Sequence, residues 1–195
     1  MIEAPPRTWR RASRGRADWA QTLMNSDSKP VEPERTVLVI GYGSTGHGDD
    51  GLGRLAAECL MQAELPPGVQ VVACHKLGPE LAQSIAAADF VLFLDAREGE
   101  PPGVLDCAIV RPGASAPVTG ENMRPPALLA LAEDQAGGVP PAMLLTVRAN
   151  SFEPGEPISD ACESVLPIVV ECATLLTRRF SADPPDLTNL LLQPE

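Results

Sequence analysis

Carboxylates placed after apolar segments are the side chains of this 195-residue chain best placed to do chemistry. Asp49 and Asp50 lie in the glycine-rich stretch 41–53, and Asp95 ends the apolar run 90–94. A charge at the end of a buried strand destabilises the fold unless it is paired, hydrogen-bonded or metal-bound. Carboxylates beside glycines suit a cation better than an anion, because oxygen ligands on a flexible backbone can close around a metal. We therefore expect one carboxylate of the glycine-rich stretch, Asp49 or Asp50, to face Asp95 across a cleft.

The glycine-rich stretch also has two simpler interpretations. Gly41, Gly43 and Gly46 match the GxGxxG fingerprint of dinucleotide-binding proteins, which is a weak pattern on its own. Further glycines and two carboxylates separate it from the next helix, where phosphate would bind, and the second strand ends without an acidic ribose ligand. We therefore disfavour nucleotide binding. In the other interpretation, Asp49 caps the following helix and Asp50 favours the positive end of that helix.

The elements that must position these side chains alternate along the chain. The patterns predict strands 36–40, 69–73, 90–94, 104–110 and 143–147, and helices 50–62, 79–88, 126–135 and 159–179. Such alternation predicts a mostly parallel, twisted five-stranded sheet with helices on both faces and with sites beyond the carboxyl ends of the strands. Asp106 interrupts the fourth strand, which suggests an edge position. Ser159 suits the N-cap of the last helix, which Pro167 should kink or split.

Composition divides the chain near residue 35. Residues 1–35 have a net charge of +2 and little aliphatic pattern, so we expect a disordered N-terminal extension there. We expect the α/β domain at 36–180 and a loosely docked C-terminal tail at 181–195, which contains several prolines.

The charge and the apolar content exclude several classes of protein. The chain carries a net charge of −11, whereas nucleic acid binding needs a basic face. No apolar run approaches the roughly 18 to 20 residues that span a bilayer, and no apolar segment follows the N-terminal arginines as in a secretion signal. The five cysteines form no CxxC pair and suit a reducing compartment. We expect a cytoplasmic monomer with no nucleic acid or membrane partner.

Several motifs, taken in order, resemble one protein family. They are the stretch 37–53, then Leu94-Asp95-Ala96, and in addition 75–81, 126–132 with Pro140, and 151–159. In this order and spacing they are similar to the hydrogenase maturation endopeptidases, which trim the C-terminus of the nickel-iron hydrogenase large subunit. The similarity covers residues 36–179, which is nearly the whole expected domain.

The resemblance implies a three-layer α/β/α sandwich and an endopeptidase that acts on the large-subunit precursor after nickel insertion. It implies that nickel, supplied by the precursor, is recognised by an acidic residue at the position of Asp50, by an aspartate at that of Asp95, and by a histidine just before the third helix. Asp50 and Asp95 are thereby assigned to both catalysis and metal contact. No covalent nucleophile is established for the family, so a water polarised by the metal or by a carboxylate is the expected attacker.

Two positions differ from the family pattern. Ser44 stands where the family usually has Asn, and residues 120–123, where the histidine is expected, contain none. Glu121 could replace it as a metal ligand and give an all-oxygen site, and His47 or His75 could do so instead. The leading hypothesis is an active processing endopeptidase, either metal-dependent or aspartate-type. The alternative is a non-cleaving homologue that acts as a hydrogenase assembly or nickel-site binding module.

Overall fold

The computed structural model describes residues 35–113 and 123–182, all within one compact unit, Glu32–Glu195. The expected N-terminal extension and C-terminal tail lie outside the described residues, except for Arg35, Ser181 and Ala182. Ser181 and Ala182 continue the last helix, and Ser181 is buried. The division of the chain into extension, domain and tail therefore stays a prediction.

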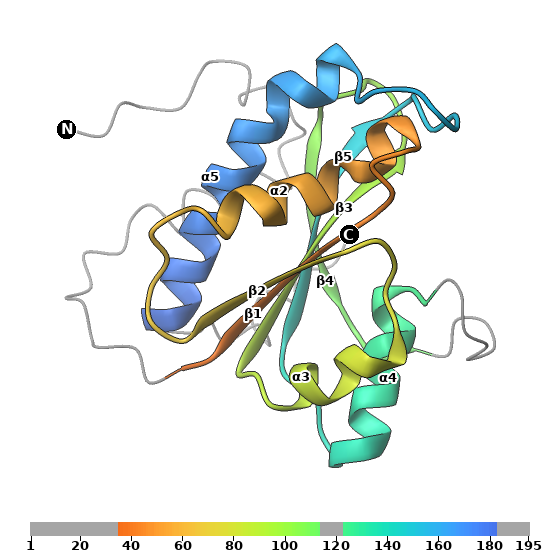
Figure 1. The fold of residues 1–195 in the computed structure, drawn as a ribbon. Helices are drawn as coiled ribbons and strands as arrows, with labels where there is room; N and C mark the ends of the chain where they lie inside the picture. The colour runs from red at the N-terminus through yellow and green to blue at the C-terminus, as the bar shows by residue number, and fades with distance from the viewer. Residues whose placement is uncertain (1–34, 114–122, 183–195) are drawn as a thin grey trace, which may run out of the picture. The chain divides into compact units, whose positions relative to one another are not determined.

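Five strands form one sheet in the order β2-β1-β3-β5-β4 (Figure 1). They are β1 (Val37–Tyr42), β2 (Val69–Cys74), β3 (Phe90–Glu98), β4 (Leu105–Val110) and β5 (Ala142–Ala149). β1, β2, β3 and β5 are parallel, whereas β4 pairs antiparallel with β5 at an edge. The mostly parallel sheet is confirmed, and so is the edge position of the strand that contains Asp106.

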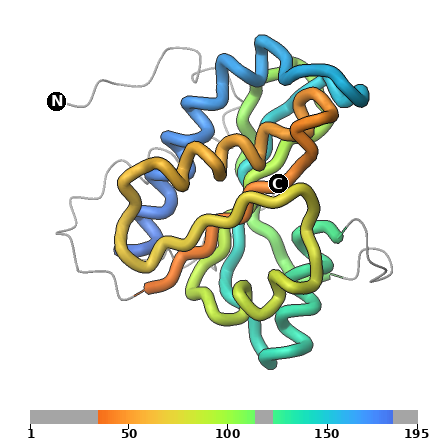
Figure 2. The backbone as a smooth tube through the Cα atoms, in the orientation of Figure 1, coloured from red at the N-terminus to blue at the C-terminus, as the bar shows by residue number. Residues whose placement is uncertain are grey.

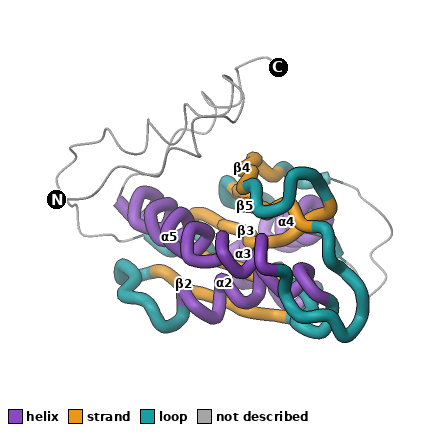
Figure 3. The backbone as a smooth tube through the Cα atoms, turned by 90° about the horizontal axis from the view of Figure 1, so that it is seen from above, coloured by secondary structure: helices purple, strands orange, loops and turns teal. Residues whose placement is uncertain are grey.

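Helices cover both faces of this sheet (Figure 2 and Figure 3). They are α2 (Leu52–Leu60), α3 (Ala82–Ala86), α4 (Pro125–Ala136) and α5 (Asp160–Ala182), with 3-10 turns at Gly48–Gly51 and Pro79–Leu81 leading into α2 and α3. α2 packs against α5 on one face, and α3 packs against α4 on the other. The three-layer α/β/α sandwich is therefore confirmed. No helix among the described residues is long and apolar enough to cross a bilayer.

The central strands are buried on both faces, which explains their continuous apolar sequence. Residues 37–40 of β1 and 90–94 of β3 are at most 1% exposed. Phe90 of β3 stacks on Phe180 of α5, with ring centroids 3.5 Å apart. This contact anchors the C-terminal part of α5 on the sheet, because burying two aromatic rings removes a large apolar area from water.

The last helix runs unbroken through its proline. α5 is one helix of 23 residues with Pro167 inside it, so the expected split does not occur. Val165 and Val169, on either side of the proline, are both buried. Tertiary packing of the apolar face therefore outweighs the hydrogen bond that proline removes.

β3 extends further than its apolar sequence indicates. The apolar run ends at Leu94, but β5 remains paired with β3 as far as Glu98 opposite Ala149. The pairing of β3 with β1 ends earlier, at Leu94 opposite Gly41. Asp95 therefore lies inside β3, one residue beyond the last contact with β1, and not at the end of the strand as the sequence suggested.

The same register places Tyr42 and Asp95 on one face of the sheet. Ile40 and Phe93, two residues earlier in each strand, belong to the core cluster formed with α3 and α4, and Tyr42 packs against that cluster. Side chains alternate along a strand, so Asp95 lies on the same face. The N-cap of α4 is Arg124, whose charge acts on both Tyr42 and Asp95.

Candidate active site

The carboxylate of Asp95 is held by two hydrogen bonds. Tyr42 Oη donates to Asp95 Oδ2 at 2.6 Å, and the backbone N–H of Ala96 donates to Asp95 Oδ1 at 2.8 Å. Both carboxylate oxygens therefore have a partner, which offsets part of the cost of burying the charge. The carboxylate is partly buried and has a defined orientation at the point where β3 passes the end of β1.

Its surroundings make Asp95 a stronger base than an ordinary aspartate. Burial raises the pKa of Asp95 to about 6, against the hydrogen bonds from Tyr42 and Ala96, and the charge of Asp50 adds to the increase. At pH 7 the carboxylate is mostly ionised, yet it binds a proton more readily than usual, which suits a general base. Burial, and then the charge of Asp95, also raise the pKa of Tyr42 above its ordinary value, so the phenol remains a donor.

Asp50 reaches the same place from the loop that follows β1. It lies in the 3-10 turn Gly48–Gly51, and its Oδ2 accepts a hydrogen bond of 2.6 Å from the backbone N–H of Ser44. Its charge acts on both Asp95 and Tyr42. The structure thus places Asp50, in the turn after β1, close enough to Asp95, within β3, for its charge to act on that carboxylate. The chemical roles of both residues stay predictions.

The glycines of this loop allow close packing. Gly43 has a φ of 131°, and a Cβ atom there would collide with the carbonyl oxygen of Asp50. At Gly53 in α2, a Cβ would collide with the carbonyl oxygens of Leu94 and Tyr42. The glycines therefore let α2 and the loop approach the strand ends. At Gly43 and Gly53, close packing is therefore the reason that a side chain is excluded.

Asp49 holds the loop that carries Asp50 against a segment that is distant in the sequence. It is fully buried, and it accepts hydrogen bonds from Ser159 N at 2.7 Å, Ser159 Oγ at 3.0 Å and Ser151 N at 3.2 Å. Ser159 Oγ also accepts a bond of 3.3 Å from Cys162 N, which confirms it as the N-cap of α5. The interpretation that Asp49 caps its own helix is wrong, because neither the turn nor α2 has a side-chain cap.

The candidates for a third metal ligand do not complete a site within the described residues. His47 is exposed, and its Nδ1 lies 2.7 Å from Ser44 Oγ. His75 is exposed just beyond β2, and Glu121 lies outside the described residues. Over residues 35–113 and 123–182, no three or more His, Cys, Asp or Glu side chains are grouped so as to hold a metal ion. The described residues therefore do not form a metal site by themselves.

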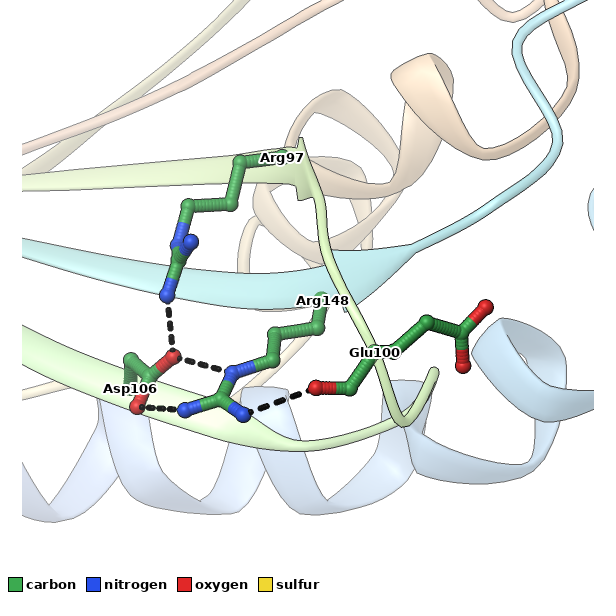
Figure 4. Close-up of polar contacts among 4 residues, drawn as sticks. All are labelled: Arg97, Glu100, Asp106 and Arg148. Carbon is green, nitrogen blue, oxygen red and sulfur yellow. Dashed lines mark hydrogen bonds and ion pairs between the residues drawn. The ribbon is translucent and has the colours of Figure 1, made fainter.

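A cluster of two arginines and one aspartate joins β3, β4 and β5, with Arg97 in β3, Asp106 in β4 and Arg148 in β5 (Figure 4). Asp106 Oδ2 accepts hydrogen bonds from Arg97 at 2.7 Å and from Arg148 Nε at 2.8 Å. Arg148 also donates to the backbone oxygen of Glu100 at 3.0 Å. The bond from Arg148 is the main reason that the pKa of Asp106 lies below its ordinary value. Asp106 therefore joins β3, β4 and β5, which accounts for an acidic residue in an otherwise apolar edge strand.

Tyr42 is the candidate site residue that the sequence did not indicate. It is the chain's only tyrosine and stands between two glycines of the GxGxxG-like pattern. Its partner Asp95 comes 53 residues later, so the pairing depends on the register of β1 against β3. A polar aromatic residue at the end of a buried strand was the one signal that could have identified it.

Fold and site together define a class of protein: an α/β/α sandwich with one carboxylate in the turn after β1 and a second within β3, just beyond the last residue that pairs with β1. No family model matches the sequence, and no curated protein matches it significantly.

Among solved structures, the fold is that of hydrogenase maturation proteases. The [NiFe] hydrogenase maturation protease HycI of Thermococcus kodakarensis KOD1 is 21% identical with a TM-score of 0.60, covering 74% of this chain and 93% of its own. The maturating endopeptidase HybD of E. coli is 22% identical, with the same TM-score and coverage. The hydrogenase 2 maturation peptidase of Thaumarchaeota archaeon SCGC_AB-539-E09 is 23% identical with a TM-score of 0.53, covering 82% of this chain and 100% of its own. The resemblance found in the sequence is thus confirmed as a likeness of fold.

Proposed function

We propose that this protein is an endopeptidase that removes the C-terminal extension of a nickel-iron hydrogenase large-subunit precursor after nickel insertion. The proposal is supported by the fold, which solved proteases of hydrogenase maturation share. The observation that carries it is the partly buried Asp95, whose pKa is raised to about 6 next to the second carboxylate of Asp50. A carboxylate with a raised pKa beside a second carboxylate is typical of hydrolytic sites.

The reaction would be hydrolysis of one peptide bond by water. In our proposal Asp95 takes a proton from the attacking water, whose oxygen adds to the scissile carbonyl carbon. The same proton then passes to the leaving nitrogen as the carbon–nitrogen bond breaks. A base that is ionised at pH 7, but with a raised pKa, is suited to both transfers. This makes the protein an aspartate-assisted hydrolase even if the metal belongs to the substrate.

Nickel in the precursor is the proposed recognition element. Asp50 and Asp95 supply two oxygen ligands, and such ligands can bind a cation that already has other ligands in the precursor. Glu121, His47 and His75 remain the candidates for a third contact. A site with only two carboxylates in the described residues fits transient contact with a metal in the substrate better than permanent storage of one.

The test uses purified full-length protein and a large-subunit precursor prepared with and without nickel. We expect the nickel-loaded precursor to lose its C-terminal extension and the nickel-free precursor to remain intact, as measured by intact-protein mass spectrometry. Cleavage of both forms would remove nickel from the proposal but keep the endopeptidase.

A non-cleaving assembly factor is the alternative function. It is favoured by the absence of a third metal ligand among the described residues. Size-exclusion chromatography of the same mixtures separates the two functions. A stable complex with a full-length, nickel-loaded precursor would support the binding module and contradict the endopeptidase. The cytoplasmic location and the monomeric state belong to the proposal in either case.

A further inference from the structure

Tyr42 is placed to control the orientation of the Asp95 carboxylate. It is the last residue of β1, and its ring packs against the core cluster between the sheet and helices α3 and α4. The ring is thus held by packing, and its hydroxyl reaches from β1 to β3 to donate the 2.6 Å hydrogen bond to Asp95 Oδ2. The other oxygen of the carboxylate is held by the backbone at Ala96.

These two bonds fix a side chain that otherwise rotates freely. The χ2 angle of aspartate is broad, so one backbone contact leaves several orientations of the carboxylate accessible. The second bond, from a packed aromatic residue, selects one of them. Reactions that depend on a positioned base lose rate when its orientation becomes uncertain, even if substrate binding is unchanged.

We propose that Tyr42 is a positioning residue for the reaction, because its hydroxyl holds Asp95 in the one orientation that meets the attacking water. This inference rests on the proposed endopeptidase function. It adds a residue to the site that none of the sequence motifs indicated. It also commits to an effect on turnover, kcat, with little effect on KM.

The first experiment compares Tyr42→Phe with the unaltered protein in cleavage of the nickel-loaded precursor. The variant removes only the hydroxyl and keeps the packed ring. We expect kcat to fall by about tenfold, which is the lower end for loss of a residue that orients a functional ligand, with KM unchanged. The matched control is Thr174→Val, which removes a hydroxyl that donates to Val170 O at 2.8 Å inside α5. It should leave both constants unchanged.

A second experiment uses the fact that Tyr42 is the only tyrosine in the chain. Growth on 3-fluorotyrosine labels this one position in the untagged protein and keeps the hydroxyl donor. We expect the labelled protein to cleave at close to the unlabelled rate, which separates loss of the hydroxyl from a general disturbance of the ring. Its single ¹⁹F resonance should shift in Asp95→Asn and stay in place in Thr174→Val.

The outcomes distinguish this inference from the function on which it rests. If the unaltered protein cleaves and Tyr42→Phe has the same kcat, with or without a raised KM, the positioning role of Tyr42 is wrong. The proposed endopeptidase function is then unaffected. If the unaltered protein does not cleave, both fail. The ¹⁹F comparison needs no variant of Tyr42, so it decides even if Tyr42→Phe does not fold. A resonance unaffected by Asp95→Asn would overturn the proposal.

Discussion

Asp49 and Ser159 are separated by 110 residues in the sequence and are joined by two hydrogen bonds. Through them the loop that carries Asp50 is tied to the N-terminus of α5. The backbone N–H of Ser151 adds a third bond to the same buried carboxylate. The fully buried Asp49 therefore acts as a structural anchor for the loop that carries Asp50.

The first prediction concerns this anchor. Asp49→Asn replaces one acceptor oxygen with an amide donor that faces other donors, so at least one buried bond is lost. We expect the free energy of unfolding at pH 7 to fall by about 2 kcal/mol, measured by urea denaturation. The control Asp134→Asn, at an exposed position in α4, should change it by less than about 0.5 kcal/mol. Equal effects in the two variants would refute the anchor.

The difference in unfolding free energy between the unaltered protein and Asp49→Asn should depend on pH. Burial alone raises the pKa of Asp49, but the bonds from Ser159 and Ser151 outweigh it and keep the pKa below its ordinary value. A lowered pKa gives stability that is present at neutral pH and is lost as the pH falls, because the unfolded chain takes up the proton first. The difference between the unaltered protein and Asp49→Asn should therefore narrow below about pH 4. A difference that stays constant down to pH 3 contradicts this.

Asp95→Asn should change stability in the opposite direction. The raised pKa of Asp95 means that its charge destabilises the fold once the pH exceeds the ordinary aspartate value, and that the effect is complete above pH 6. Asparagine removes the charge and can still bond Tyr42 and Ala96. We expect Asp95→Asn to be more stable than the unaltered protein by about 1 to 2 kcal/mol at pH 7.5, after allowing for partial exposure, and similar to it at pH 4. Thermal denaturation at the two pH values tests this, and a destabilised variant at pH 7.5 would count against it.

The close packing of α2 against the strand ends predicts an unusual glycine effect. In most helices Gly→Ala is stabilising, but a Cβ at Gly53 would collide with backbone oxygens of Leu94 and Tyr42. We expect Gly53→Ala to lower the free energy of unfolding by about 3 kcal/mol and to reduce processing by displacing both strand ends. Gly138→Ala is the matched control, because nothing lies within 4 Å of its Cβ position. If both variants keep full stability, α2 is not packed as described.

The proposed third metal contact can be tested at Glu121. We expect Glu121→His to preserve or increase processing, because the resemblance of the sequence to the maturation endopeptidases implies a histidine at this place, and imidazole suits nickel better than carboxylate does. The measurement is the initial rate of precursor cleavage beside the unaltered protein, with Glu133→Gln as a control at an exposed carboxylate. A sharp loss of rate in Glu121→His alone would show that Glu121 has a role of its own.

Most of the fold could be predicted from the sequence because buried parallel strands have a recognisable apolar sequence pattern. Continuous apolar runs identify β1 and β3, since both faces of those strands are covered by helices. The extension of β3 beyond Leu94 could not be predicted, because it depends on pairing with β5 and not on local composition. The split expected at Pro167 does not occur for a similar reason, since packing keeps α5 in one piece. The kink that was the other expectation stays a prediction.

The candidate site was predictable only in part. Asp50 follows β1 and Asp95 follows the apolar part of β3, and the carboxyl ends of parallel strands lie at one edge of a sheet. The proximity of the two residues could therefore be expected from the topology. Two other contacts in the site could not be predicted from the topology. The bond from Tyr42 depends on the register of two strands, and the partners of Asp49 lie in a loop more than a hundred residues later. No local pattern encodes such contacts.

The most direct test of the account is intact-protein mass spectrometry of a nickel-loaded large-subunit precursor after incubation with the unaltered protein, Asp50→Asn or Asp95→Asn. We expect the unaltered protein to shorten the precursor at its C-terminus, and both variants, folded by circular dichroism, to leave it full length. A precursor that remains full length with the unaltered protein, or that either variant shortens at the unaltered rate, would contradict the central claim.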